Sequence, residues 1–142
     1  MNIVLTSHGT LCDGMLDTYK KMVSSDSPII AVGLGDDGVD VFREHLSNAV
    51  QTQLESGNTL ILADLLGGTP YNEAYALFLE NPEHLRVVSG FNFGMLIEVG
   101  IAAAASDDLN AVVELALNAG SSGITAATLP DEDGSLADDD LF

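Results

Sequence analysis

Four short apolar runs, separated by helical patterns, limit the folds open to this chain more than any other feature. Each run is rich in Val, Ile or Leu and is followed within two residues by Gly or Asp. Continuous apolar runs of this length are typical of strands that are buried on both faces of a parallel sheet. The predicted strands are residues 2–7, 28–34, 59–63 and 86–89.

Helical patterns follow these runs along the chain. Between the second and third runs, apolar residues recur at spacings of three and four from Val41 to Leu54, and Gly57 ends the pattern. Residues 94–105 and 107–118 predict two further helices, the second with Ser106 as its N-cap. This alternation predicts an α/β fold with a mostly parallel open sheet and helices on both faces. We expect the strand order 2-1-3-4, as in flavodoxin-like sheets.

The C-terminal part of the chain differs in character from the rest. Residues 124–128 are a candidate for an extra antiparallel strand, and the apolar segment 124–129 is a candidate for exchange between the protomers of a dimer. Residues 130–142 are acidic with little apolar support, which is typical of a mobile tail. We therefore expect one domain over residues 1–129 and a tail over residues 130–142.

The charge balance is strongly acidic, with 22 Asp and Glu residues against 4 Lys and Arg residues and a formal net charge of −18. Nucleic acids and anionic membranes are poor partners for such a chain, because binding them depends on cations. A basic partner protein or a halophilic setting fits this charge, and the charge alone does not separate the two.

The chain also carries signs of a reducing compartment. Its single cysteine, Cys12, excludes an internal disulfide. The N-terminus lacks a signal-peptide pattern, and the longest apolar helical segment is interrupted by Glu98 and is too short to cross a bilayer. We expect a cytoplasmic protein.

His8 and Asp64 each close one of the predicted strands. In the expected strand order, the first and third strands are neighbours, so both residues lie at the topological switch point where open α/β sheets build their sites. A carboxylate that accepts a hydrogen bond from one imidazole nitrogen fixes the tautomer and leaves the lone pair of the other nitrogen free for attack. The pair therefore predicts a nucleophilic histidine.

Gly67, Gly68 and Thr69 follow Asp64 closely and lead into a helix, with Thr69 expected as the N-cap and Pro70 at the first helical position. The free N–H groups of such a helix end favour an anion. No Gly-Lys-Ser/Thr follows the glycines, which excludes a nucleotide P-loop and favours a single phosphoryl group. A tight turn without a ligand is the structural alternative. We expect no cofactor and no metal.

Gly9, Asn72 and Asn92 are candidates for supporting the loops around this site. Gly9 follows His8, Asn72 lies in the helix that Thr69 opens, and Asn92 follows the fourth strand. We expect Asn92 either to orient its loop or to bond a ligand.

Three segments carry a resemblance to a known family: Ser7-His8-Gly9 with Gly14 downstream, Asp64-Leu65-Leu66-Gly67-Gly68-Thr69-Pro70-Tyr71-Asn72, and Gly90-Phe91-Asn92 with Met95-Leu96. In order and spacing they resemble the enzyme IIA domain of the mannose family of the bacterial phosphoenolpyruvate-dependent sugar phosphotransferase system. The resemblance covers residues 2 to about 118. Its second motif is specific, whereas Ser-His-Gly alone is a weak signal.

The resemblance implies a cytoplasmic phosphocarrier, usually a homodimer. Its histidine, here His8, takes a phosphoryl group from the histidine-containing phosphocarrier protein and passes it to enzyme IIB, and membrane sugar permease subunits take part indirectly. The supporting aspartate of the family maps onto Asp64, and its hydroxyl at the helix start maps onto Thr69, where serine is more usual. Cys12 stands where alanine is common, and Gly94 replaces a proline, a departure that bears on partner docking rather than on chemistry.

Three alternatives share parts of this pattern. The phosphotransfer subunit of a dihydroxyacetone kinase is similar in fold and in its first histidine motif, but lacks the Gly-Gly-Ser/Thr-Pro run. A histidine phosphatase needs an arginine directly before the His-Gly pair, where this chain has Ser7. A non-catalytic regulatory module on the same fold would tolerate loss of His8. The sequence does not name the sugar.

Overall fold

The computed structural model describes residues 1–131 of the chain. Its four strands form one parallel sheet in the order β2-β1-β3-β4. This confirms the predicted fold class and strand order. The strands are β1 Asn2–His8, β2 Ile30–Leu34, β3 Thr59–Ala63 and β4 Leu85–Val88.

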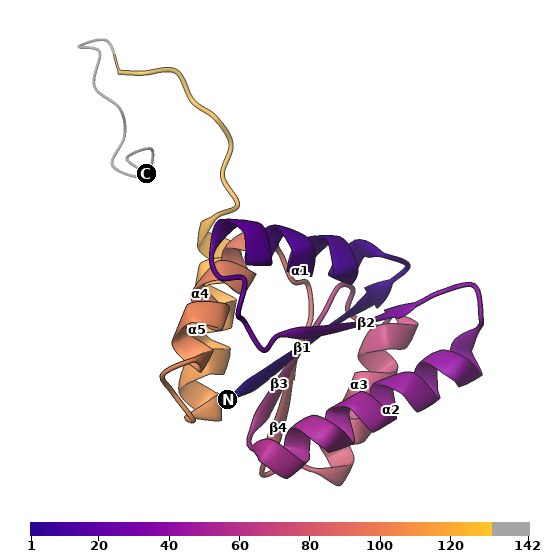
Figure 1. Ribbon diagram of the computed structural model, residues 1–142. Coiled ribbons are helices and arrows are strands. Elements are labelled where there is room, and N and C mark those ends of the chain that lie inside the picture. Colours follow the sequence, from indigo (N-terminus) through magenta and orange to yellow (C-terminus); the bar gives the residue numbers. More distant parts are fainter. Residues whose placement is uncertain (132–142) are drawn as a thin grey trace.

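Helices cover both faces of the sheet (Figure 1). On one face, α1, α4 and α5 pack against β1 and β3, and on the other face α2 and α3 do so. The helices are α1 Leu11–Met22, α2 Val39–Ser56, α3 Thr69–Glu80, α4 Phe93–Ala103 and α5 Leu109–Ser122.

Each face of the sheet has its own apolar core. Ile3 and Leu5 of β1 contribute to the core under α1, α4 and α5, whereas Val4 lies in the core under α2 and α3. All five residues of β3 are buried. Because successive side chains of a strand point to opposite faces, a strand with a core on each side needs apolar residues at every position. This explains the continuous apolar runs of the sequence.

The start of α5 differs from the prediction. Asp108, not Ser106, is the N-cap, because its carboxylate accepts a hydrogen bond from the Ala111 N–H at 3.1 Å. Ser106 instead accepts a hydrogen bond from the Asp108 N–H at 3.2 Å, which shapes the turn before the helix. The helix therefore begins two residues later than expected, and it continues to Ser122.

Residues 124–131 leave the body of the domain after α5 (Figure 1). They form no strand in the single chain, and Ile124 and Leu129 are 77% and 91% exposed. Exchange of this segment between protomers stays a prediction. Most of the tail expected over residues 130–142 lies outside the described residues. Within residues 1–131, no helix has the length and apolar character needed to cross a membrane.

Candidate active site

His8 is the last residue of β1 and lies at the carboxyl edge of the sheet. The ladder between β1 and β2 continues one residue further, where the Gly9 N–H donates to the Leu34 carbonyl at 2.7 Å. Gly9 then takes a φ of 56°, a left-handed conformation that favours glycine. The chain thus turns directly after His8, and the His8 side chain stays 47% exposed at the edge.

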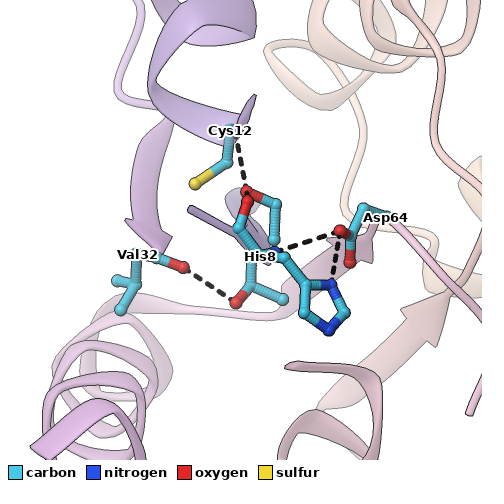
Figure 2. A network of polar contacts seen from close by, with 6 residues as sticks. His8, Cys12, Val32 and Asp64 are labelled. Atoms are coloured by element: carbon cyan, nitrogen blue, oxygen red, sulfur yellow. Dashed lines mark hydrogen bonds and ion pairs between the residues drawn. The ribbon is translucent and has the colours of Figure 1, made fainter. Parts of the chain in front are cut away.

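Two buried hydroxyl groups hold the end of β1 in place. The Thr6 hydroxyl donates to the Val32 carbonyl of β2 at 2.8 Å (Figure 2). The Ser7 hydroxyl accepts the Cys12 N–H of α1 at 2.9 Å and donates to the His8 carbonyl at 3.1 Å. These hydroxyls fix the backbone on both sides of His8. Neither hydroxyl is among the site residues expected from the sequence, although two adjacent hydroxyl residues in an apolar strand are a signal of such a role.

Asp64 meets His8 from the neighbouring strand, directly after β3. Its N–H donates to the Thr6 carbonyl at 3.2 Å, which places the carboxylate beside the end of β1. One carboxylate oxygen, Oδ2, accepts the His8 backbone N–H at 3.0 Å and lies 2.9 Å from the ring nitrogen Nδ1 (Figure 2). The structure thus brings His8 and Asp64 together at the switch point between β1 and β3.

The electrostatics of this pair fix the tautomer of His8. Burial raises the pKa of the Asp64 carboxyl, but the hydrogen bonds from the His8 ring and backbone and the imidazole charge outweigh it and hold the pKa below its ordinary value. Asp64 is therefore ionised at neutral pH, and an ionised carboxylate accepts a hydrogen bond from the protonated Nδ1. The lone pair of Nε2 is then free.

A tight turn leads from Asp64 into α3. Gly67 has a φ of 79°, and the Gly68 N–H donates to the Leu65 carbonyl at 3.1 Å. Asn72 holds the turn from the helix: its side-chain amide donates to the Gly67 carbonyl at 3.1 Å, and its N–H donates to the Gly68 carbonyl at 2.9 Å. Asn72 therefore joins the first turn of α3 to both glycines of the turn.

The N-cap of α3 is Gly68 and not Thr69, so that expectation was wrong by one residue. The Gly68 carbonyl accepts the first bond of the helix, which makes Thr69 the first helical residue. Because the Gly68 N–H is bound to Leu65, it is not free to bind a phosphoryl group. Within residues 1–131, neither the N–H nor the hydroxyl of Thr69 has a hydrogen-bond partner, so both are available donors.

Asn92 supports helices rather than the surroundings of His8. Its side-chain oxygen accepts the Met95 N–H at 2.9 Å, which caps α4, and its amide donates to the Gly120 carbonyl of α5 at 2.7 Å. Both polar groups are thus engaged in joining α4 to α5. Of the two roles that the sequence left open, the structure favours orientation of the loop.

Positive charge is scarce around the site. Within residues 1–131, Asp64 is the only ion-pair partner of His8. Arg43 lies on α2 near the same edge of the sheet, but its guanidinium is bound to Asp40 at 3.1 Å and to Glu73 at 3.0 Å. Lys20 and Lys21 lie in the last turn of α1, at the opposite edge. The site therefore has an imidazole, a carboxylate bound to it and an open helix end, and no free cation from the described part of the chain adjoins them.

Comparison with known proteins places the chain in a family. A family model described as "PTS system fructose IIA component" matches residues 2–117. The fructose-specific EIIA component of Bacillus subtilis (strain 168) is 26% identical over 100 residues, covering 70% of this chain and 68% of that protein. The mannose-specific EIIAB component of Escherichia coli (strain K12) is 25% identical over 126 residues. That match covers 87% of this chain, which spans only 38% of the length of the EIIAB component.

Solved structures agree with this assignment. The mannose/sorbose-specific IIA subunit from Enterococcus faecalis superposes with a TM-score of 0.76 at 30% identity, covering 92% of this chain and 96% of that chain. The phosphotransferase system component EIIA from Streptococcus agalactiae superposes with a TM-score of 0.79 at 26% identity, covering 89% and 97%. The chain therefore belongs to the mannose family of enzyme IIA components of the sugar phosphotransferase system.

Proposed function

We propose that this chain is a cytoplasmic phosphocarrier that accepts a phosphoryl group on His8 from the histidine-containing phosphocarrier protein and passes it to enzyme IIB. Enzyme IIB then uses the group for sugar uptake and phosphorylation, in which the membrane permease subunits take part indirectly. The observation that carries the proposal is the 2.9 Å contact between His8 Nδ1 and Asp64 Oδ2. It leaves Nε2 as the nucleophile, on a side chain that is exposed to a partner.

The chemistry requires no proton transfer to or from His8. The Nε2 lone pair attacks the phosphorus, the bond from phosphorus to the donor nitrogen breaks, and its electron pair returns to the donor imidazole. The Nδ1 proton stays in the hydrogen bond to Asp64, whose carboxylate stabilises the positive charge that develops on the His8 ring. In the second transfer, His8 is the donor. The acceptor attacks the phosphorus, the bond from phosphorus to Nε2 breaks, and its electron pair returns to the His8 ring.

The phosphoryl oxygens need donors, because transfer passes through a loose transition state that is stabilised mainly by positioning and charge. We assign Thr69 this role through its free N–H and hydroxyl, at the positive end of the α3 dipole. Gly67 and Gly9 contribute by turning the chain on either side of the site. Neither a metal nor a cofactor has a part in this scheme.

The partner proteins supply the missing cations in this proposal. Leu11, Leu65 and Leu66 are exposed and adjoin His8 and Asp64 along the chain. Asp36 and Asp37 are also exposed, in the loop that follows β2 at the same edge of the sheet. A surface of leucines with acidic neighbours fits a basic partner with an apolar centre.

We also propose that the protein is a homodimer in which the segment 124–129 packs on the partner protomer. Two apolar side chains of this segment are more than three-quarters exposed in the single chain. Exposure of such side chains to water is unfavourable in free energy. Contact with a second copy would bury them.

The first prediction tests His8 as the phosphoryl acceptor. Incubation with phosphoenolpyruvate and the general phosphotransferase proteins should give an acid-labile, base-stable phosphate on the wild type. His8→Ala should abolish the label, because the nucleophile is lost, while His45→Ala, which changes an exposed histidine on α2, should keep it. An unlabelled wild type would overturn the proposal and favour a non-catalytic regulatory module.

The second prediction concerns Asp64. Asp64→Asn keeps the volume of the side chain but removes the charge that stabilises the Nδ1-protonated ring, so labelling should slow by about a hundredfold. Asp26→Asn removes an exposed carboxylate at the far edge of the sheet and should have little effect. Stopped-flow or quenched-flow labelling measures both rates. Equal rates for the two variants would remove Asp64 from the mechanism.

The third prediction concerns salt. If a basic donor is steered by the net charge of −18, the rate of phosphoryl transfer to this chain should fall by at least about tenfold as ionic strength rises from 0.02 M to 0.5 M. Circular dichroism at each salt concentration checks that the fold is unchanged. A rate that is flat or rises with salt would count against steering and favour a halophilic origin of the charge.

The fourth prediction concerns the dimer. Size-exclusion chromatography with light scattering should give twice the monomer mass for the full chain. Deletion of residues 124–142 should give a folded monomer, because the exchanged segment is lost, whereas deletion of residues 132–142 alone should leave the dimer intact. A full-length chain of monomer mass would refute the dimer, and a dimer that survives the longer deletion would refute the role of the segment.

A further inference from the structure

Gly68 lies directly against the reactive edge of the His8 imidazole. A Cβ atom added at residue 68 would lie 2.7 Å from the ring carbon Cε1 and 3.3 Å from Nε2. These separations are shorter than ordinary van der Waals contact, so the ring occupies the space that any larger residue at position 68 would fill. The edge of the ring formed by Cε1 and Nε2 therefore faces the position that a side chain at residue 68 would take.

The backbone conformation of Gly68 does not itself require glycine. Its φ of −72° and ψ of 164° lie in the extended region that other residues adopt readily. The neighbouring Gly67 is the opposite case, since its φ of 79° favours glycine while a Cβ there would meet nothing within 4 Å. The two adjacent glycines thus serve different purposes, Gly67 for the turn and Gly68 for space.

Residue 68 cannot retreat from the ring. Its N–H is bound to the Leu65 carbonyl at 3.1 Å, and its carbonyl accepts the Asn72 N–H at 2.9 Å. An added Cβ would also lie 3.3 Å from the Leu65 carbonyl oxygen, so it could not move away from the ring toward Leu65. A larger residue at position 68 must therefore displace the imidazole rather than the turn.

We propose that Gly68 is a positioning residue for His8, which together with Asp64 fixes the direction in which Nε2 points. Asp64 holds the ring at Nδ1, and Gly68 limits it at the Cε1 and Nε2 edge, so the ring is confined between β3 and the start of α3. With nearly half of the His8 side chain exposed, few other contacts confine it. The effect of Gly68 on phosphoryl transfer rests on the proposed function. The placement of the His8 ring can be measured in the unphosphorylated protein.

Substitution of Gly68 by alanine tests this inference, with Gly35→Ala as the matched control. Gly35 is an exposed loop glycine at the same edge of the sheet, with no positive φ and nothing within 4 Å of an added Cβ. The ¹⁵N chemical shifts of the His8 ring in unphosphorylated protein should show the Nδ1-protonated tautomer in the wild type and in Gly35→Ala. Gly68→Ala should give a mixture of tautomers, because displacement of the ring weakens its bond to Asp64.

The rate of phosphoryl labelling gives the second readout. We expect Gly68→Ala to slow labelling by about a hundredfold, because a misplacement of about 1 Å is enough for such a loss, and Gly35→Ala to stay within about twofold of the wild type. A folded Gly68→Ala variant with the wild-type tautomer and the wild-type rate would overturn the inference. If the wild type is never labelled but Gly68→Ala changes the tautomer, the proposed function fails and the positioning inference stands.

A third variant covers the case in which Gly68→Ala does not fold. The same substitution in a His8→Ala background removes the imidazole, and with it the contact that position 68 must avoid. Thermal unfolding should then show a folded protein in which the alanine at position 68 is tolerated. Failure of the double variant to fold would place the clash elsewhere and overturn the inference.

Discussion

The hydrogen bond between Asp64 and the His8 ring is the interaction on which the site depends. The same carboxylate oxygen also binds the His8 backbone N–H, so the side chain and the main chain of one residue share one acceptor. Asp64 reaches this position because β1 and β3 are neighbours and because its own N–H continues the ladder to the Thr6 carbonyl. The strand order is thus what brings the two side chains together.

Much of the fold follows from the sequence because the signals are strong and local. Continuous apolar runs predict strands with a core on both faces, and their alternation with helices predicts a parallel sheet. The pairing of His8 with Asp64 also follows, since two residues that close neighbouring strands meet at one edge. These inferences need only the order of the elements.

Features that depend on single contacts could not be predicted in this way. The shift of the N-cap from Thr69 to Gly68 is set by which carbonyl accepts the Asn72 N–H, and Asp108 displaces Ser106 for a similar reason. Residue type does not decide which position becomes the N-cap in either helix, because Gly, Thr, Ser and Asp are all favoured there. The contact between Gly68 and the imidazole joins segments sixty residues apart and has no counterpart in local sequence. Exchange of the C-terminal segment depends on a second chain.

If His8 is phosphorylated as proposed, the glycine N-cap of α3 affects the relative stability of the phosphorylated and unphosphorylated protein. Without a side-chain cap, the first turn of α3 keeps unsatisfied donors, and glycine at this position forgoes a few tenths of a kcal/mol relative to a hydroxyl or carboxamide cap. An anion at a helix N-terminus contributes about 0.3–1 kcal/mol. Phosphorylation of His8 would therefore do for α3 what a capping side chain does in other helices, and the charged carrier would be the more stable form of the domain.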